Sequence, residues 1–140
     1  MKFDEVNIGE VFNSSSYTIS KEEIIEFALQ FDSQYMHVDE EKANQSIFKG
    51  IIASGVHTLS LSIKLWNEIS VWGTDVIAGT GMKNIEYTKP VYPGDDLYVM
   101  AEVIKKRGKR KSGEVTILLT TYKNDGIQVL KAEMSALLVK

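Results

Sequence analysis

The chain has 140 residues, of which 44% are hydrophobic and 25% charged, with a formal net charge of −3. This length and composition predict one globular domain, residues 1–140, and the negative balance argues against a nucleic-acid partner, which would require a dominant basic face. The chain has no cysteine, so disulfides, thiolate chemistry and cysteine–metal sites are excluded. The first ten residues do not resemble a signal peptide, and the apolar stretch 50–66 is too interrupted to span a bilayer. We therefore expect a cytoplasmic protein with no membrane partner.

The first expected element is a helix that starts at Ser20. Ser20 and Glu23 have the spacing of a capping box, in which each side chain satisfies a backbone N–H at the helix start. An apolar stripe with helical spacing follows and is interpreted as core: Ile24, Phe27, Ala28 and Phe31. A short second helix is expected after Asp39, whose carboxylate suits an N-cap.

The stretch from Ser54 to Trp66 predicts a buried helix. Its apolar residues fall on more than one side, with Val56, Leu59 and Ile63 on one and Leu61 and Leu65 on another. A helix that is apolar nearly all round is buried. The rest of the chain is therefore expected to wrap around it.

Three later runs alternate apolar and other residues with the period of two that marks half-buried strands. They are residues 97–103, 115–121 and 130–138, and Asn124-Asp125-Gly126 between the last two supplies a turn. Pro90 and Pro93 predict a loop before the first run. Short connections make these strands antiparallel neighbours, which indicates the α+β class with a sheet covered by helix on one face.

Asp32 and His37 lie directly after the first helix and are candidate catalytic residues. A carboxylate and an imidazole five residues apart in a loop can meet in one small volume, take a proton from water and return one to carbon. The alternative is a loop cap beside a surface histidine. The spacing alone does not decide between them.

A second candidate region is Gly50–Thr58, at the entrance of the expected buried helix. Small residues there let a ligand approach the backbone, and free N–H groups at a helix start stabilise a developing oxyanion. The alternative is capping by Ser54, with Gly55 admitting close packing.

Three blocks in order resemble the MaoC-like dehydratases, which include (R)-specific enoyl-CoA hydratases. They are Asp32 to His37 (D-x4-H), Gly50 to Thr58 (G-x-x-A-S-G-x-H-T) and Lys89 to Asp95 (K-P-V-x-P-G-D). The resemblance covers roughly residues 5–138. It implies the hot-dog fold, an antiparallel sheet wrapped around a central helix, and a homodimer or dimer of dimers.

The resemblance also implies an activity and a site. A trans-2-enoyl thioester would be hydrated to the (R)-3-hydroxyacyl product, or the reverse, with Asp32 and His37 holding the water. The backbone N–H of Gly55 would bind the thioester oxygen, and Tyr35, Ser54 and Val56 would contact substrate. Neither a metal nor another cofactor is expected, and the substrate would be an acyl-CoA or an acylated carrier protein.

The chain departs from the family pattern at several positions. Ser33 and Tyr35 stand where prolines are common, and Ile63 stands where many members have a serine that orients the catalytic Asp. Ser60 and Ser62 lie nearby, so this supporting role is unassigned. His57 is expected to pack or hydrogen-bond near the helix start, and the run 105–111 is expected to be a solvated hairpin turn, with contact to coenzyme A phosphates as the alternative.

Two other functions stay open. A hot-dog thioesterase usually has an acid at the central helix as base or nucleophile, and here no acid precedes Glu68. A non-catalytic acyl-CoA binding module is the other alternative. The sequence does not define the acyl chain length, the thiol carrier, the direction of reaction, or which of Asp32 and His37 is the base.

Overall fold

The computed structural model describes residues 1–140, in which six strands form one sheet in the order β1-β4-β5-β6-β3, with β2 also pairing with β4. All pairs are antiparallel. The strands are β1 (Val11–Asn13), β2 (Tyr17–Thr18), β3 (Val76–Tyr87), β4 (Asp96–Gly108), β5 (Ser112–Lys123) and β6 (Ile127–Val139).

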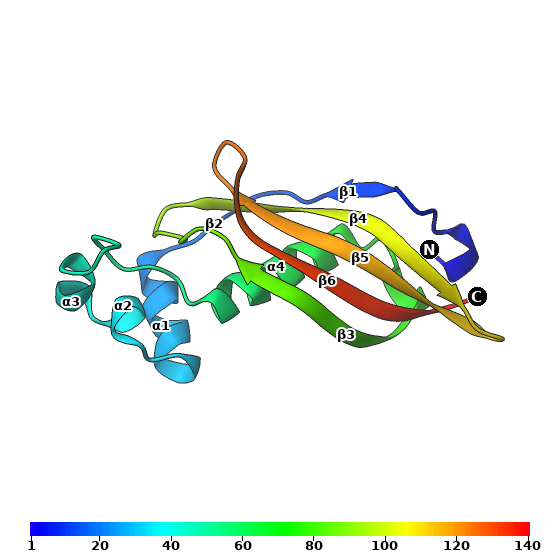
Figure 1. Cartoon of the computed structure of the whole chain (residues 1–140), viewed down its shortest axis with the longest axis horizontal. Helices are drawn as coiled ribbons and strands as arrows, with labels where there is room; N and C mark the ends of the chain where they lie inside the picture. The colour runs from blue at the N-terminus through cyan, green and yellow to red at the C-terminus, as the bar shows by residue number, and fades with distance from the viewer.

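The helices are α1 (Lys21–Phe31), α2 (Tyr35–Val38), α3 (Glu40–Asn44) and α4 (Gly55–Ile69), with 3-10 turns η1 (Phe3–Glu5) and η2 (Gly73–Asp75). Figure 1 shows α4 lying along one face of the sheet, α1 to α3 gathered at one end, and both termini at the other end. None of these helices combines the length and apolarity needed to cross a membrane. The expected α+β class, a sheet wrapped around a central helix, is confirmed.

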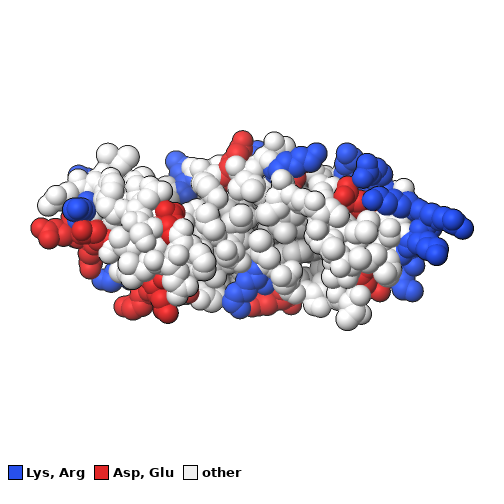
Figure 2. Space-filling view, turned by 90° about the horizontal axis from the view of Figure 1, so that it is seen from below, with Lys and Arg blue, Asp and Glu red and all other residues white.

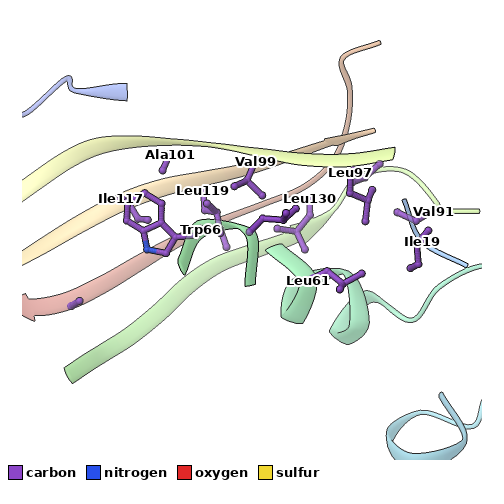
Figure 3. Close-up of a cluster of buried hydrophobic side chains, with 14 of the residues drawn as sticks. Ile19, Leu61, Trp66, Val91, Leu97, Val99, Ala101, Ile117, Leu119 and Leu130 are labelled. Carbon is purple, nitrogen blue, oxygen red and sulfur yellow. The ribbon is translucent and has the colours of Figure 1, made fainter. Parts of the chain in front are cut away.

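The core lies between α4 and the inner face of the sheet. Leu61, Leu65 and Trp66 of α4 are buried against alternate residues of β4, β5 and β6 (Figure 3). The fully buried strand residues include Val99, Leu119 and Leu130, and each such side chain contributes about 1.5–3 kcal/mol. The core therefore anchors α4 rigidly, and with it the loop at its N-terminus.

Most expected elements are confirmed by local geometry. The Ser20–Glu23 capping box is formed in both directions, and the Asp39 carboxylate accepts from the N–H of Lys42. Asn124 and Gly126 have positive φ, as the expected turn requires. The three alternating runs are β4, β5 and β6.

Two expectations about burial were wrong. Phe31 is 69% exposed, because only the Ile24 and Ala28 side of α1 is buried. Val56 is 50% exposed, because α4 packs against the sheet through another side.

Candidate active site

The end of α1 and the short helix α2 bring Asp32 and His37 together. The N–H of Asp32 donates to the carbonyl of Ala28 and closes α1, while the Ser33 hydroxyl donates to the same carbonyl at 3.0 Å. The chain then reverses into α2, which contains His37. Nε2 of His37 lies 3.5 Å from Oδ2 of Asp32.

The tautomer of neutral His37 follows from its second ring nitrogen. Nδ1 lies 2.6 Å from the carbonyl oxygen of Ile52, and a carbonyl can only accept. Nδ1 therefore carries the hydrogen, and Nε2 keeps a free lone pair directed at the Asp32 side. His37 is 6% exposed, and the N–H of Ile52 donates to Met36, so the ring is fixed to this segment.

Asp32 accepts two side-chain hydrogen bonds. The Ser54 hydroxyl donates to Oδ2 at 2.7 Å, and the Gln34 amide donates to Oδ1 at 3.1 Å. The bond from Ser54, helped by Gln34 and His37, lowers the pKa of Asp32 below its usual value, although partial burial acts in the opposite direction. Asp32 is therefore ionised at neutral pH.

The pair is arranged as two acceptors that face one gap. Neutral Nε2 and ionised Oδ2 cannot hydrogen-bond each other, because neither atom carries a hydrogen. A water molecule can donate one hydrogen to each. The geometry is therefore suited to hold and orient a water with its oxygen lone pairs turned toward a substrate.

The N-terminus of α4 supplies unpaired donors next to the pair. The backbone N–H groups of Gly55, Val56 and His57 have no acceptor within the protein. Ser54 is the N-cap residue but makes no capping bond, since its hydroxyl is bound to Asp32. These donors and the positive end of the helix favour an anionic oxygen.

Gly55 is required by the close approach of Tyr87. A Cβ at position 55 would lie 2.6 Å from two carbons of the Tyr87 ring, closer than real Cβ atoms come. The ring therefore covers the start of α4. It leaves room only for a residue without a side chain.

A cavity of about 290 Å³ lies between His37 and the start of α4. Its lining includes His37, Gly55, Thr58, Tyr87, Val91 and Val129, but not Asp32. His37 and Gly55 therefore border the same cavity.

The sequence model of one protein family, the MaoC-like domain, matches residues 4–124 of the chain. The chain belongs to the MaoC-like dehydratase family. It is 50% identical to the uncharacterized protein YdeM of Bacillus subtilis, over 99% of each chain. Among solved structures, it is similar to the monoamine oxidase regulatory protein of Archaeoglobus fulgidus, with 33% identity and a TM-score of 0.93 over 100% of this chain and 95% of the other. It is also similar to R-hydratase PhaJ1 of Pseudomonas aeruginosa, with 26% identity and a TM-score of 0.77 over 99% of this chain and 86% of the other. The resemblance and the expected hot-dog fold are confirmed.

Three residues that were expected to contact substrate do not line the cavity of this MaoC-like domain. Tyr35 and Val56 are 48% and 50% exposed, and Ser54 is fully buried against Asp32. Their contact with substrate stays a prediction. The sequence did not define which residues orient Asp32, and in the structure Ser54 and Gln34 hydrogen-bond to it. The two other candidates do not, since the hydroxyls of Ser60 and Ser62 donate to carbonyls of their own helix.

His57 lies beside the site of this MaoC-like domain but faces elsewhere. It is 5% exposed and stacks on Phe27 with 4.3 Å between ring centroids, and its Nδ1 has no hydrogen-bond partner. Burial lowers the pKa of His57, partly opposed by the charge of Glu23. The packing role expected for His57 fits this environment.

The basic run 105–111 forms the end of β4 and the turn that leads to β5. Figure 2 shows Lys and Arg gathered at the end of the molecule away from α1 to α3. Lys106 is bound to the carbonyl of Val6, and Arg107 lies 3.7 Å from Glu114. Within one chain, the run is remote from Asp32 and His37, as a solvated hairpin would be.

Proposed function

We propose that this MaoC-like domain adds water to trans-2-enoyl thioesters to give (R)-3-hydroxyacyl thioesters, and catalyses the reverse dehydration. The observation that carries the proposal is the pair of acceptors, Oδ2 of Asp32 and Nε2 of His37, 3.5 Å apart beside the unpaired N–H of Gly55. Family membership supports hydratase or dehydratase chemistry. The similarity to a protein named R-hydratase supports the stereochemistry.

His37 is proposed as the base. The water donates one hydrogen to Oδ2 of Asp32 and the other to Nε2 of His37, and its oxygen attacks the β-carbon of the enoyl group. Nε2 takes a proton as the C–O bond forms, and the imidazolium is stabilised by ionised Asp32, whose pKa is lowered mainly by Ser54. Asp32 thus orients the water and balances the charge.

The electrons of the double bond move toward the thioester oxygen, which becomes an enolate oxygen. The N–H of Gly55 would donate to it at the positive end of α4. The enolate then reforms the carbonyl, and the α-carbon takes a proton from the imidazolium, which restores neutral His37. The net reaction adds one water molecule across the double bond. It requires no electron acceptor and no further cofactor.

The proposed partner is a second copy of the chain, paired through β3. All twelve residues of this strand are exposed, and β3 lies at the end of the strand order with one backbone edge unpaired. Exposed apolar side chains include Val76, Met82 and Ile85. A long unprotected edge of this kind favours pairing with another strand, and pairing with its own copy gives a closed two-fold dimer.

Incubation with crotonyl-CoA tests the function. Hydration removes the absorbance of the conjugated enoyl thioester without releasing thiol, whereas a thioesterase releases free thiol and a binding module does neither. Chiral analysis of the product should give the (R) alcohol. The same assay with crotonyl-carrier protein defines the thiol carrier.

Substitution tests the pair. Asp32→Asn and His37→Gln should each lower kcat by about 10²–10⁴-fold with an unchanged circular dichroism spectrum. Asp39→Asn is the matched control, because this nearby carboxylate accepts from the N–H of Lys42 and caps α3. Wild-type rates in either site variant would overturn the mechanism.

A further inference from the structure

The loop of residues 88–95 lines the active-site cavity through its first four residues and is held by a buried ion pair. Nζ of Lys123, at the end of β5, lies 3.3 Å from Oδ2 of Asp95, and the two side chains are only 12% and 13% exposed. The same ammonium donates at 2.8 Å to the carbonyl of Pro90 and lies 5.2 Å from the centre of the Tyr92 ring. Because a buried charge needs such partners, the ammonium holds the loop in place.

Asp95 also folds this loop back on itself. Its Oδ2 accepts from the N–H of Tyr92 at 2.8 Å, and its Oδ1 accepts from the side-chain amide of Asn124 at 3.2 Å. Both oxygens of the carboxylate therefore have partners within the protein, and Asp95 does not line the cavity. These contacts give Asp95 a structural role and do not make it a substrate ligand.

Two hydrogen bonds connect the loop to the segment 48–54, which precedes α4. The Tyr92 hydroxyl donates at 2.8 Å to the carbonyl of Phe48. The N–H of Ala53 donates at 2.9 Å to the carbonyl of Val91, a core residue that is 3% exposed (Figure 3). The segment contains no helix or strand of its own, so its shape depends on bonds of this kind.

The same segment sets the tautomer of His37. The Ile52 carbonyl lies 2.6 Å from Nδ1 of His37, and the N–H of Ile52 donates at 3.1 Å to the carbonyl of Met36. Ile52 directly precedes Ala53, whose N–H is bound to the loop. If the loop shifts, the carbonyl that keeps the hydrogen on Nδ1 moves with it. The ring can then carry its hydrogen on Nε2, and the lone pair needed for the water is lost.

We propose that Tyr92 and Lys123 are positioning residues for His37. Lys123 holds the loop, Tyr92 joins the loop to the segment, and the segment presents the Ile52 carbonyl to Nδ1. Neither Tyr92 nor Lys123 lines the active-site cavity, so their effect on the reaction passes through His37. This inference rests on the proposed function and adds two residues, distant along the chain, to the support of its base.

Tyr92→Phe tests the link between the loop and the segment, because it removes only the hydroxyl that binds the Phe48 carbonyl. Nitrogen NMR of the protein without substrate, in mildly alkaline solution, gives the tautomer of His37 from the chemical shifts of its ring nitrogens. The spectrum of His37→Gln assigns these signals, since the chain has only two histidines. The wild type should carry the hydrogen on Nδ1 alone, and Tyr92→Phe should show a share of the other tautomer.

The kinetics of Tyr92→Phe should follow the tautomer. We expect kcat for crotonyl-CoA to fall about twofold to tenfold, the equivalent of one hydrogen bond, while KM stays within about twofold. Tyr98→Phe is the matched control. Tyr98 is partly buried like Tyr92, but its ring stacks on Tyr122 and its hydroxyl takes no part in the hydrogen bonds of the loop. Both kcat and the tautomer should be those of the wild type in this control.

Lys123→Met combined with Asp95→Asn tests the ion pair. The double substitution removes both charges together, because either charge alone would be buried without its partner. Met has an unbranched side chain of similar length but cannot donate to the Pro90 carbonyl. The double variant should shift the tautomer of His37 at least as far as Tyr92→Phe does. If it does not fold, Tyr92→Phe alone decides the inference.

An unchanged tautomer or an unchanged kcat in Tyr92→Phe would overturn the inference. A purely structural role would lower the free energy of unfolding and leave the histidine ring as it is in the wild type. The NMR readout needs no substrate. If the wild type does not hydrate crotonyl-CoA, the proposed function fails, while the spectra still decide whether the loop positions His37.

Discussion

Ser54 donates its hydroxyl hydrogen at 2.7 Å to the same Oδ2 of Asp32 that faces Nε2 of His37 across 3.5 Å. Ser54 is fully buried at the start of α4 and forms no capping bond to its own helix. Its hydroxyl therefore links the carboxylate to the rigid central helix. It also stabilises the ionised form of that carboxylate, because it donates to it.

Ser54→Ala should shift the acidic limb of the pH–rate profile to higher pH. Ser54 is the main cause of the lowered pKa of Asp32, so its removal raises that pKa, and the ionised form is lost earlier as the pH falls. A lost hydrogen bond to a charged group of about 1.5 kcal/mol would reduce kcat/KM about tenfold near neutral pH. Steady-state kinetics from pH 4 to 8 measure both effects.

Ser60→Ala is the control for this variant. Its hydroxyl donates at 2.9 Å to the Val56 carbonyl of the same helix and does not touch Asp32. The profile of Ser60→Ala should coincide with the wild type. An unmoved acidic limb in Ser54→Ala would show that Asp32 does not define that limb.

Gly55→Ala should lower both stability and activity through its clash with Tyr87. The added Cβ would stand 2.6 Å from the ring, and overpacking of this kind costs about 1–3 kcal/mol. Chemical denaturation measures the free energy of unfolding. If the clash is the cause, Tyr87→Ala should restore part of the stability in the double variant, and a strictly additive loss would contradict it.

The sequence predicts those parts of the fold whose pattern is local. The alternation of β4, β5 and β6 is visible because α4 covers one face of each strand, and the capping box at Ser20 places α1. The spacing of Asp32 and His37 in one short loop makes a pair possible, and the resemblance to the MaoC-like family predicts it. The structure places their side chains within 3.5 Å of each other.

The parts that escape prediction depend on distant contacts or on uncovered surfaces. Strand β3 has no burial pattern, since all of its residues are exposed, and three register shifts break its alternation. The bond of Ser54 to Asp32 spans 22 residues, and the contact of Tyr87 with Gly55 spans 32. Neither side chain belongs to a local motif that reveals its partner.

His57 should make the protein less stable in mild acid. Burial lowers the pKa of His57 below the ordinary value of 6.5. Just below this pH, His57 is therefore protonated in the unfolded chain and still neutral in the folded chain. Well above pH 6.5, His57 does not reduce the free energy of unfolding. Below this pH the free energy of unfolding falls as the pH approaches the lowered pKa of the folded state, by at most about 1.4 kcal/mol per pH unit. His57→Phe should remove this dependence while His37 stays in place. Equal pH slopes of the free energy of unfolding in the two proteins would refute this account.

If the proposed dimer pairs through β3, Met82→Lys should make the protein monomeric, because it places a charge near the middle of the strand where two copies would cross. Met82 is 37% exposed, so the folded monomer should lose little stability, within about 0.5 kcal/mol. Val11→Lys is the matched control: Val11 is 46% exposed and lies on β1, the opposite edge strand of the same sheet. Light scattering coupled to gel filtration should give a monomer for Met82→Lys and a dimer for Val11→Lys. A dimer in both variants would place the interface elsewhere, and loss of the dimer only in Val11→Lys would assign it to β1.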